Sequence, residues 1–145
     1  MIKVGINGLG RIGRIALRSI LERDNIEVVA INDLLEINHL AYLLKFDSVH
    51  RRFKGSVKVE KDVLLINGKP VRITSEKNPE NIQWDKVDTD FVIESTGYFT
   101  KKDKAALHIK GGAKKVVISA PSKDAPMFVM GVNHRKLNKT DLVFS

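Results

Sequence analysis

The chain has 145 residues, 43% of them apolar, so it is long enough for one domain with a hydrophobic core, and its composition argues against intrinsic disorder. Its net charge of +8 favours acidic or phosphorylated partners, although charge alone does not choose among them. The absence of cysteine excludes a disulfide framework, a thiolate zinc site and a cysteine nucleophile within these residues.

The first part of the chain alternates strand and helix patterns. An apolar run at residues 2–6 ends at glycines, and apolar residues then recur with helical spacing over residues 12–20. The continuous apolar run at residues 28–31 predicts a strand buried on both faces, and a second helical stripe follows at residues 37–44. This strand–helix–strand–helix order predicts a parallel sheet.

Residues 53–74 change to an alternating pattern that is typical of antiparallel strands. The apolar members of this pattern are Val57 and Val59, then Val63 and Leu65, then Val71 and Ile73. Asn67-Gly68 between the second and third pairs is a hairpin signal. We therefore expect a small antiparallel insertion in the sheet.

The pattern of a buried strand returns at residues 91–93, and a helix is expected after it. Thr100 and Asp103 have the spacing of a capping box at the start of this helix, and Gly111-Gly112 would end it. Two further apolar runs, at residues 116–118 and 127–132, predict more strands of the same sheet, and residues 142–144 form a last apolar, strand-like run.

These elements together predict a Rossmann-type α/β fold over residues 1–145, with a doubly wound, mostly parallel sheet and a small antiparallel insertion. The final apolar run reaches the end of the chain without a polar exit, which suggests a chain interrupted partway through a larger fold. No apolar run approaches the about 18 residues of a spanning helix, and residues 1–8 lack the charged lead of a signal peptide. We therefore expect a cytoplasmic protein without a membrane partner.

The strongest local signal is the sequence Gly8-Leu9-Gly10-Arg11-Ile12-Gly13, a G-x-G-x-x-G motif between a predicted strand and a predicted helix. In this setting Gly8 allows a tight turn, Gly10 lets the backbone approach a pyrophosphate, and Gly13 lets helix and strand pack closely. Asp33 stands 20 residues after Gly13, where a carboxylate can accept hydrogen bonds from ribose hydroxyls. A compact turn at the glycines and a turn- or helix-capping role for Asp33 would also explain these residues. The glycine motif and Asp33 together nevertheless favour a nucleotide site.

Two other loops follow predicted strands, Ser95-Thr96-Gly97 and Ser119-Ala120-Pro121. Ligands of open α/β sheets bind beyond the carboxyl ends of the strands, so both loops could line one crevice. Small hydroxyl residues, Gly and Pro are also ordinary loop residues, and alone these segments favour that interpretation.

The basic segment and the histidines carry weaker signals. Residues 101–115 contain six lysines against one aspartate, which suggests nucleic-acid binding, but the segment has no aromatic residue to stack on a base. A solvated helix face is the favoured interpretation, and nucleic acid is not an expected partner. The four histidines, His39, His50, His108 and His134, lack metal-ligand spacing, so we expect polar or packing roles and no metal site.

Five segments of the sequence resemble glyceraldehyde-3-phosphate dehydrogenases, collinearly over essentially the whole chain. They are residues 7–14 (NGLGRIGR), 31–34 (INDL), 43–50 (LLKFDSVH), 94–97 (ESTG) and 119–122 (SAPS). Leu9 departs mildly from the phenylalanine usual in that family, and Lys77 stands where arginine is frequent. Arg51 and Arg52 replace a more usual glycine and arginine, which alters surface charge rather than the cofactor motif.

The resemblance implies that the cofactor is NAD and assigns residues to its parts. Backbone amides of the glycine motif would meet the pyrophosphate, Asp33 the adenosine ribose, Lys77 the adenine, and Ser119 the nicotinamide end. The implied cofactor-binding residues are Gly8, Gly10, Arg11, Ile12, Gly13, Asp33, Lys77, Thr96, Gly97, Phe99 and Ser119.

The resemblance also implies the reaction of the complete enzyme, an NAD-dependent, phosphorylating oxidation of glyceraldehyde 3-phosphate to 1,3-bisphosphoglycerate by a homo-tetramer. The family's catalytic cysteine, its histidine partner and its C-terminal helix would lie beyond Ser145, so we expect no catalytic residue here and no activity from this chain alone. The alternatives are the NAD-binding part of an erythrose-4-phosphate dehydrogenase, disfavoured by Asn32-Asp33 and Ser119-Ala120-Pro121, and a noncatalytic nucleotide- or nucleic-acid-binding module.

Overall fold

The structure, a computed structural model, describes residues 1–46 and 53–145. Residues 47–50 of the third family-like segment, with His50, and the basic pair Arg51 and Arg52 lie outside the described residues. The elements in chain order are β1 (Ile2–Asn7), α1 (Arg11–Leu21), β2 (Ile26–Asn32), α2 (Ile37–Lys45), β3 (Val57–Glu60), β4 (Val63–Ile66), β5 (Lys69–Thr74), η1 (Pro79–Asn81), η2 (Trp84–Val87), β6 (Phe91–Glu94), α3 (Lys102–Ala105), α4 (Leu107–Lys110), β7 (Lys115–Ile118), η3 (His134–Lys136) and β8 (Val143–Phe144).

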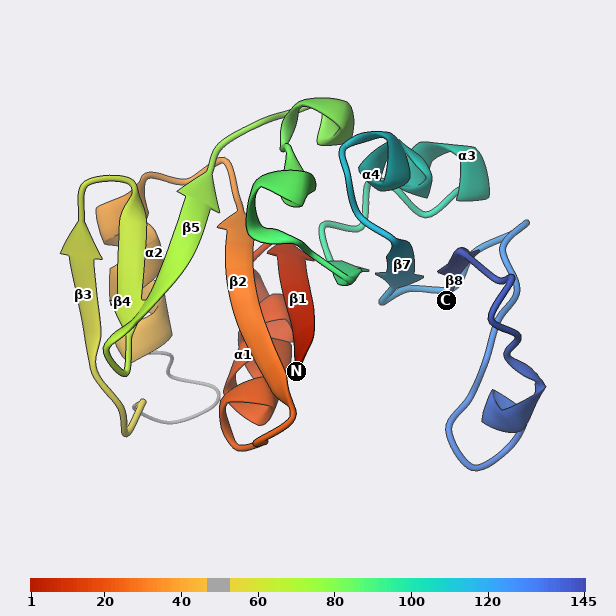
Figure 1. Cartoon of the computed structure of the whole chain (residues 1–145), viewed down its shortest axis with the longest axis horizontal. Helices are drawn as coiled ribbons and strands as arrows, with labels where there is room; N and C mark the ends of the chain where they lie inside the picture. Colours follow the sequence, from red (N-terminus) through yellow and green to blue (C-terminus); the bar gives the residue numbers. More distant parts are fainter. Residues whose placement is uncertain (47–52) are drawn as a thin grey trace.

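Within the described residues the strands form one sheet in the order β3-β4-β5-β2-β1-β6-β7-β8 (Figure 1). The pairs from β5 through β8 are parallel, whereas β3 with β4 and β4 with β5 are antiparallel. This confirms the predicted Rossmann-type sheet and its antiparallel insertion. From β1 the chain builds outward first through β2 and later through β6, which makes the β1–β6 boundary a topological switch point, where ligands of such sheets bind.

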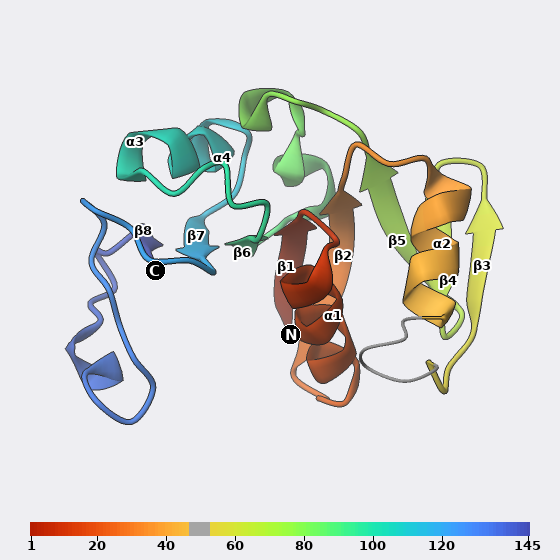
Figure 2. The same cartoon turned by 180° about the vertical axis from the view of Figure 1, so that it is seen from behind.

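Helices α1 and α2 pack on the same face of the sheet (Figure 2). Leu17 of α1 and Leu40 of α2 are fully buried there, in one cluster with Ile31 of β2. The neighbouring residue Ala30 belongs to a second cluster around Trp84, as expected when successive strand residues point to opposite faces. No helix in the described residues is long and apolar enough to cross a membrane.

The apolar stripe expected over residues 12–20 of the first helix is partly wrong. Ile12 and Ile15 are 52% and 40% exposed, and the buried positions are Gly13, Leu17 and Ile20. These three positions share one helix face at the usual spacing. The predicted stripe included Ile20 but left out Leu17 and Gly13, and Gly13 contributes no apolar side chain to the pattern.

The hairpin at Asn67-Gly68 is confirmed, since both residues have positive φ values of 53° and 80°. The alternating positions Val63 and Leu65 are not the most buried residues of β4. Leu64 and Ile66 are buried, whereas Val63 and Leu65 are only partly so. Leu64 lies opposite the buried Val71 of β5, and this pairing decides which face of β4 enters the core.

The predicted capping box of the helix after β6 is also wrong. Lys101, not Thr100, is the cap residue of α3, and the backbone N–H of Lys102 donates instead to Asp124 Oδ1 at 2.8 Å. A side chain distant in sequence therefore accepts a backbone N–H at the start of the helix. The helical segment is divided into α3 and α4, and it ends at Gly111-Gly112 as predicted, with Gly112 at a φ of 105°.

Of the last three apolar runs of the sequence, two form strands. Residues 116–118 lie in β7, and residues 143–144 form β8, parallel to β7. Residues 127–132 are not a strand, and Figure 1 shows the segment between β7 and β8 leaving the sheet. The N–H groups of Val132 and Asn133 both donate to the carbonyl of Val129 in a turn, which bends the apolar run away from an extended conformation.

Candidate functional site

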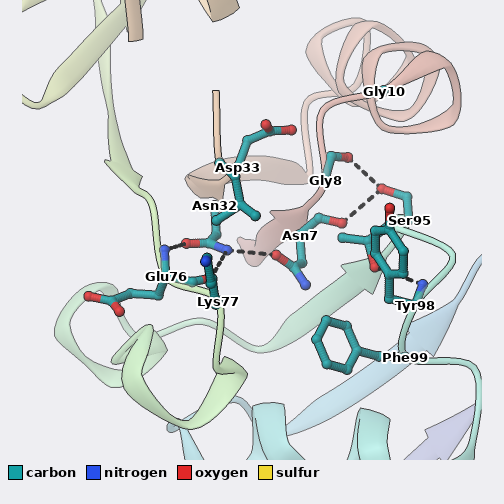
Figure 3. A pocket seen from close by; sticks show the side chains of 12 residues that line it. Asn7, Gly8, Gly10, Asn32, Asp33, Glu76, Lys77, Ser95, Tyr98 and Phe99 are labelled. Carbon is teal, nitrogen blue, oxygen red and sulfur yellow. Dashed lines mark hydrogen bonds between the residues drawn. The ribbon is translucent and has the colours of Figure 1, made fainter. Parts of the chain in front are cut away.

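A cavity of about 360 Å³ opens at the carboxyl ends of β1, β2 and β6, beside the segment after β5 (Figure 3). Its volume falls within the range of small-molecule sites. It is lined by Asn7, Gly8, Gly10, Asn32, Asp33, Leu34, Glu76, Lys77, Ser95, Thr96, Tyr98 and Phe99. The cavity therefore lies where the topology of the sheet changes direction.

The three glycines of the motif have different surroundings. Gly8 has a φ of 94°, a conformation that side chains disfavour. A Cβ at Gly13 would collide with the backbone carbonyl oxygen of Gly8, so Gly13 allows α1 to approach the turn. A Cβ at Gly10 would meet no protein atom within 4 Å. Gly10 borders the cavity as the cap residue of α1, so the open space beside it is available to a ligand.

Asp33 follows β2 directly and holds the glycine turn. Its Oδ2 accepts the N–H of Leu9 at 2.7 Å, and its Oδ1 accepts the N–H of Leu35 at 3.0 Å. The turn-carboxylate interpretation and the cavity-lining position are therefore both correct for this residue. Each carboxylate oxygen keeps a second lone pair that could accept a hydrogen bond from a ligand.

Two buried asparagines form the floor of the cavity and were not among the predicted site residues. Asn32 Nδ2 donates to Asn7 Oδ1 at 2.8 Å, while Asn32 Oδ1 accepts the N–H of Glu76 at 2.8 Å (Figure 3). Thr74 Oγ1 also donates to Asn32 Oδ1 at 2.7 Å. These bonds connect the ends of β1, β2 and β5. The sequence signal that could have revealed them is that each asparagine is a polar residue at the end of an apolar strand.

The loop after β6 forms the opposite wall. Ser95 Oγ donates to the carbonyl oxygen of Gly8 at 2.6 Å and thereby joins this wall to the glycine turn. Thr96 and Phe99, which are among the predicted site residues, line the cavity. Tyr98, which is 84% exposed, lines it as well. Tyr98 was not predicted, because the signal in this loop was the small residues Ser95, Thr96 and Gly97.

The remaining predicted residues divide between the cavity and its surroundings. Lys77 lines the cavity from the segment after β5. Arg11 and Ile12 are exposed in the first turn of α1, and Gly97 lies in the loop after β6, but none of these three lines the cavity. Ser119 is exposed after β7, outside the cavity, with its N–H donating to the carbonyl of Glu94 at 3.0 Å.

The basic segment is only partly a helix surface, because Lys114 lies between α4 and β7 and Lys115 belongs to β7. Two of its lysines contact acidic side chains. Lys114 Nζ contacts Asp90 Oδ1 at 2.9 Å, and Lys110 Nζ lies 3.8 Å from Glu80 Oε1. His108 is fully buried, 2.7 Å from Glu94 Oε1. No group of acidic, histidine or cysteine side chains among the described residues could hold a metal ion.

The comparison with known families shows the family to which the chain belongs. Residues 2–102 match the family described as "Glyceraldehyde 3-phosphate dehydrogenase, NAD binding domain". The chain belongs to this family. NAD is therefore the cofactor of the domain family in which this chain is placed, and the recognised resemblance is confirmed.

Individual glyceraldehyde-3-phosphate dehydrogenases are similar over nearly the whole chain. Glyceraldehyde-3-phosphate dehydrogenase 2 of Agaricus bisporus is 55% identical over 100% of this chain. The cytosolic enzyme of Trypanosoma brucei brucei is 56% identical over 92% of the chain, and that of Bacteroides fragilis is 53% identical over 99%. The chain spans 43%, 41% and 44% of the length of these relatives, respectively.

Proposed function

We propose that the cavity binds NAD and that the chain is the cofactor-binding part of a phosphorylating glyceraldehyde-3-phosphate dehydrogenase. The observation that carries the proposal is that Asp33 and Gly10 line the same cavity, in a chain of this domain family. No protein atom fills the space beside Gly10. An acidic side chain and a helix N-terminus are the two elements with which dinucleotide-binding folds hold a ribose and a pyrophosphate.

In this proposal Gly8 and Gly13 shape the turn, and the other predicted residues surround parts of the cofactor. Asp33 accepts the hydroxyls of the adenosine ribose, and the amides after Gly10 receive the pyrophosphate. Lys77, Thr96, Gly97 and Phe99 surround the adenine side, whereas Arg11, Ile12 and Ser119 extend toward the nicotinamide. The absence of a side chain at Gly10 leaves the space that the pyrophosphate needs. NAD, when bound, supplies the hydride acceptor.

The chemistry on the aldehyde requires groups that this chain does not contain. A thiolate forms the adduct from which hydride can leave, and the chain has no cysteine. We therefore propose that this chain alone does not oxidise glyceraldehyde 3-phosphate, and that substrate, phosphate and tetramer formation belong to the complete enzyme. A cytoplasmic location agrees with the cytosolic relative from Trypanosoma brucei brucei.

Calorimetric titration of the chain with NAD and NADP tests the cofactor assignment. We expect NAD to bind more tightly, because the carboxylate of Asp33 would oppose a 2′-phosphate. Titration with a single-stranded oligonucleotide at two salt concentrations tests the nucleic-acid alternative, since phosphate-driven binding falls steeply with salt. Equal binding of NAD and NADP, or oligonucleotide binding without NAD binding, would contradict the proposal.

A further inference from the structure

A continuous hydrogen-bonded chain of buried side chains runs beneath the cavity. Its members are Trp84, His108, Glu94, Asn7 and Asn32, whose exposed fractions are 0%, 0%, 1%, 3% and 2%. They come from η2, α4, β6, β1 and β2, so this hydrogen-bonded network joins elements that are distant in sequence. The direction of each hydrogen bond can be assigned because the network receives a hydrogen bond at each end from a group that only donates. These groups are the indole N–H of Trp84 and the backbone N–H of Glu76.

At one end, the indole of Trp84 fixes the tautomer of His108. Trp84 Nε1 lies 3.0 Å from His108 Nδ1, and an indole N–H can only donate. His108 Nδ1 must therefore accept, so the ring is neutral and carries its proton on Nε2. That proton points to Glu94 Oε1 at 2.7 Å.

At the other end, the backbone N–H of Glu76 fixes the orientation of both asparagines. It donates to Asn32 Oδ1, so Asn32 Nδ2 donates to Asn7 Oδ1, and Asn7 Nδ2 is left to donate to Glu94 Oε1 at 2.6 Å. Asn7 Nδ2 and His108 Nε2 lie 3.4 Å apart, but both are donors to the same oxygen, so they are neighbours rather than partners.

The second oxygen of Glu94 holds the loop that forms one wall of the cavity. Glu94 Oε2 accepts the N–H of Thr96 at 2.9 Å and its hydroxyl at 2.6 Å. The Thr96 hydroxyl itself accepts the N–H of Tyr98 at 3.1 Å, which directs its proton toward Glu94. Glu94 thus receives four hydrogen bonds, two on each oxygen. This set requires the ionised carboxylate, and an amide in its place would direct N–H groups against two donors.

From these contacts we propose that Glu94 and His108 are positioning residues of the cofactor site. Glu94 fixes Thr96 in one wall and Asn7 in the floor, and neutral His108 holds the carboxylate. His108 also packs edge-on against Phe99, another wall residue, with ring centroids 6.3 Å apart. The inference rests on the proposed function, because the affected quantity is the affinity for NAD.

The primary test is the NAD affinity of Glu94→Gln and His108→Leu, measured by calorimetry at a temperature at which both are folded by circular dichroism. We expect NAD binding to weaken about tenfold or more in each, because buried donors lose their acceptor and the wall loses its fixed geometry. Leu64→Ala, in β4 away from the cavity, is the matched control. It should lose stability while keeping its NAD affinity.

Thr96→Val and Thr96→Ser test the same connection from the exposed side and remain informative if the buried variants do not fold. Serine keeps the hydroxyl and should retain affinity, whereas valine should weaken binding several-fold. In a double-mutant cycle, Thr96→Val should cost less when Glu94→Gln is already present. A purely structural role for Glu94 predicts independent effects, and additivity would overturn the proposal.

A readout without ligand separates this inference from the proposed function. If the unmodified chain fails to bind NAD, the proposed function fails, but hydrogen exchange of the Thr96 and Tyr98 amides still tests the positioning role. Glu94→Gln should accelerate exchange of both amides beyond what its loss of global stability explains. Emission of Trp84, the one tryptophan of the chain, should change in His108→Leu. Unchanged exchange and emission, or NAD affinities of folded Glu94→Gln and His108→Leu within twofold of the unmodified chain, would overturn the inference.

Discussion

The two walls of the cavity are held in different ways. The glycine turn between β1 and α1 owes its shape to missing side chains, since Gly8 has a positive φ and Gly13 leaves room for the Gly8 carbonyl. The loop after β6 owes its shape to a buried carboxylate, Glu94, which receives the N–H and hydroxyl of Thr96. Backbone sterics therefore build one wall, and buried electrostatics build the other.

This difference has consequences for how the walls respond to substitution. In the glycine turn, one added carbon can displace a helix, because it meets backbone atoms that cannot rotate away. In the loop after β6, the size of a side chain matters less than its ability to accept hydrogen bonds. The predictions below separate the steric wall from the electrostatic one.

The largest effect is expected at Gly13. Gly13→Ala places a Cβ against the carbonyl oxygen of Gly8, so α1 must move and the free energy of unfolding should fall by about 2 kcal/mol or more. Gly10→Ala is the matched control, since its Cβ meets open space, and only the weaker capping by alanine should lower its stability, by less than about 1 kcal/mol. Urea denaturation measures both. Equal stability of the two variants would contradict a steric origin for this wall.

At Gly10 the expected loss is in binding rather than in folding. Gly10→Val fills the space beside the helix N-terminus, so NAD affinity should fall by at least about tenfold while the circular dichroism spectrum is unchanged. Calorimetry with NAD measures the effect. Unchanged affinity in a folded variant would show that the open space at Gly10 is not used by the cofactor.

Asp33 adds an electrostatic contact to the glycine turn, because its carboxylate accepts the Leu9 N–H, and it also borders the cavity. Asp33→Ser should narrow the preference for NAD over NADP by about 1 to 3 kcal/mol, through the loss of a charged hydrogen bond and of the repulsion of a 2′-phosphate. The ratio of the two affinities is the proper readout, because disturbance of the glycine turn weakens both cofactors. An unchanged ratio would remove Asp33 from cofactor selection.

The smallest effect is expected at Asp90, which precedes β6 at its amino end, whereas Glu94 lies at its carboxyl end. The backbone N–H of Lys3 and, secondarily, the side chain of Lys114 lower the pKa of Asp90. A lowered pKa stabilises the fold above the unfolded value of about 3.9, and this contribution is lost as pH falls through the folded value.

Asp90→Asn should therefore reduce stability near neutral pH by less than about 1 kcal/mol, because Lys114 is well exposed, and the difference should vanish in acid. NAD affinity at neutral pH should not change. Thermal melts between pH 2 and 7 measure the stability, and a deficit that persists at the acid end would contradict the charged contribution.

The sequence placed candidate residues in both walls, but it did not predict that the buried carboxylate of Glu94 holds the second wall. Gly8, Gly10 and Gly13 act through local geometry, and their spacing indicates the turn. Asp33 contacts Leu9 across 24 residues, but its distance from the glycines is part of the same sequence motif. Glu94 is linked to Asn7 and His108 across separations of 87 and 14 residues, and only the parallel pairing of β1 with β6 brings Asn7 and Glu94 side by side.

The same distinction explains the errors elsewhere in the fold. The start of α3 was misplaced because Asp124, 22 residues away, satisfies the N–H of Lys102. Residues 127–132 have an apolar composition suited to a strand, but a local turn at Val129 directs them out of the sheet. Long-range partners decided the first, and the conformation of the turn decided the second.

The central claim, that NAD occupies the cavity between these two walls, is tested most directly by NMR titration of the chain with NAD. The amides of Gly10, Thr96 and Phe99 should shift with one common dissociation constant, while those of the distant hairpin at Asn67-Gly68 stay in place. Saturating NAD that leaves the amides of both walls unmoved, or that moves the hairpin instead, would contradict the account.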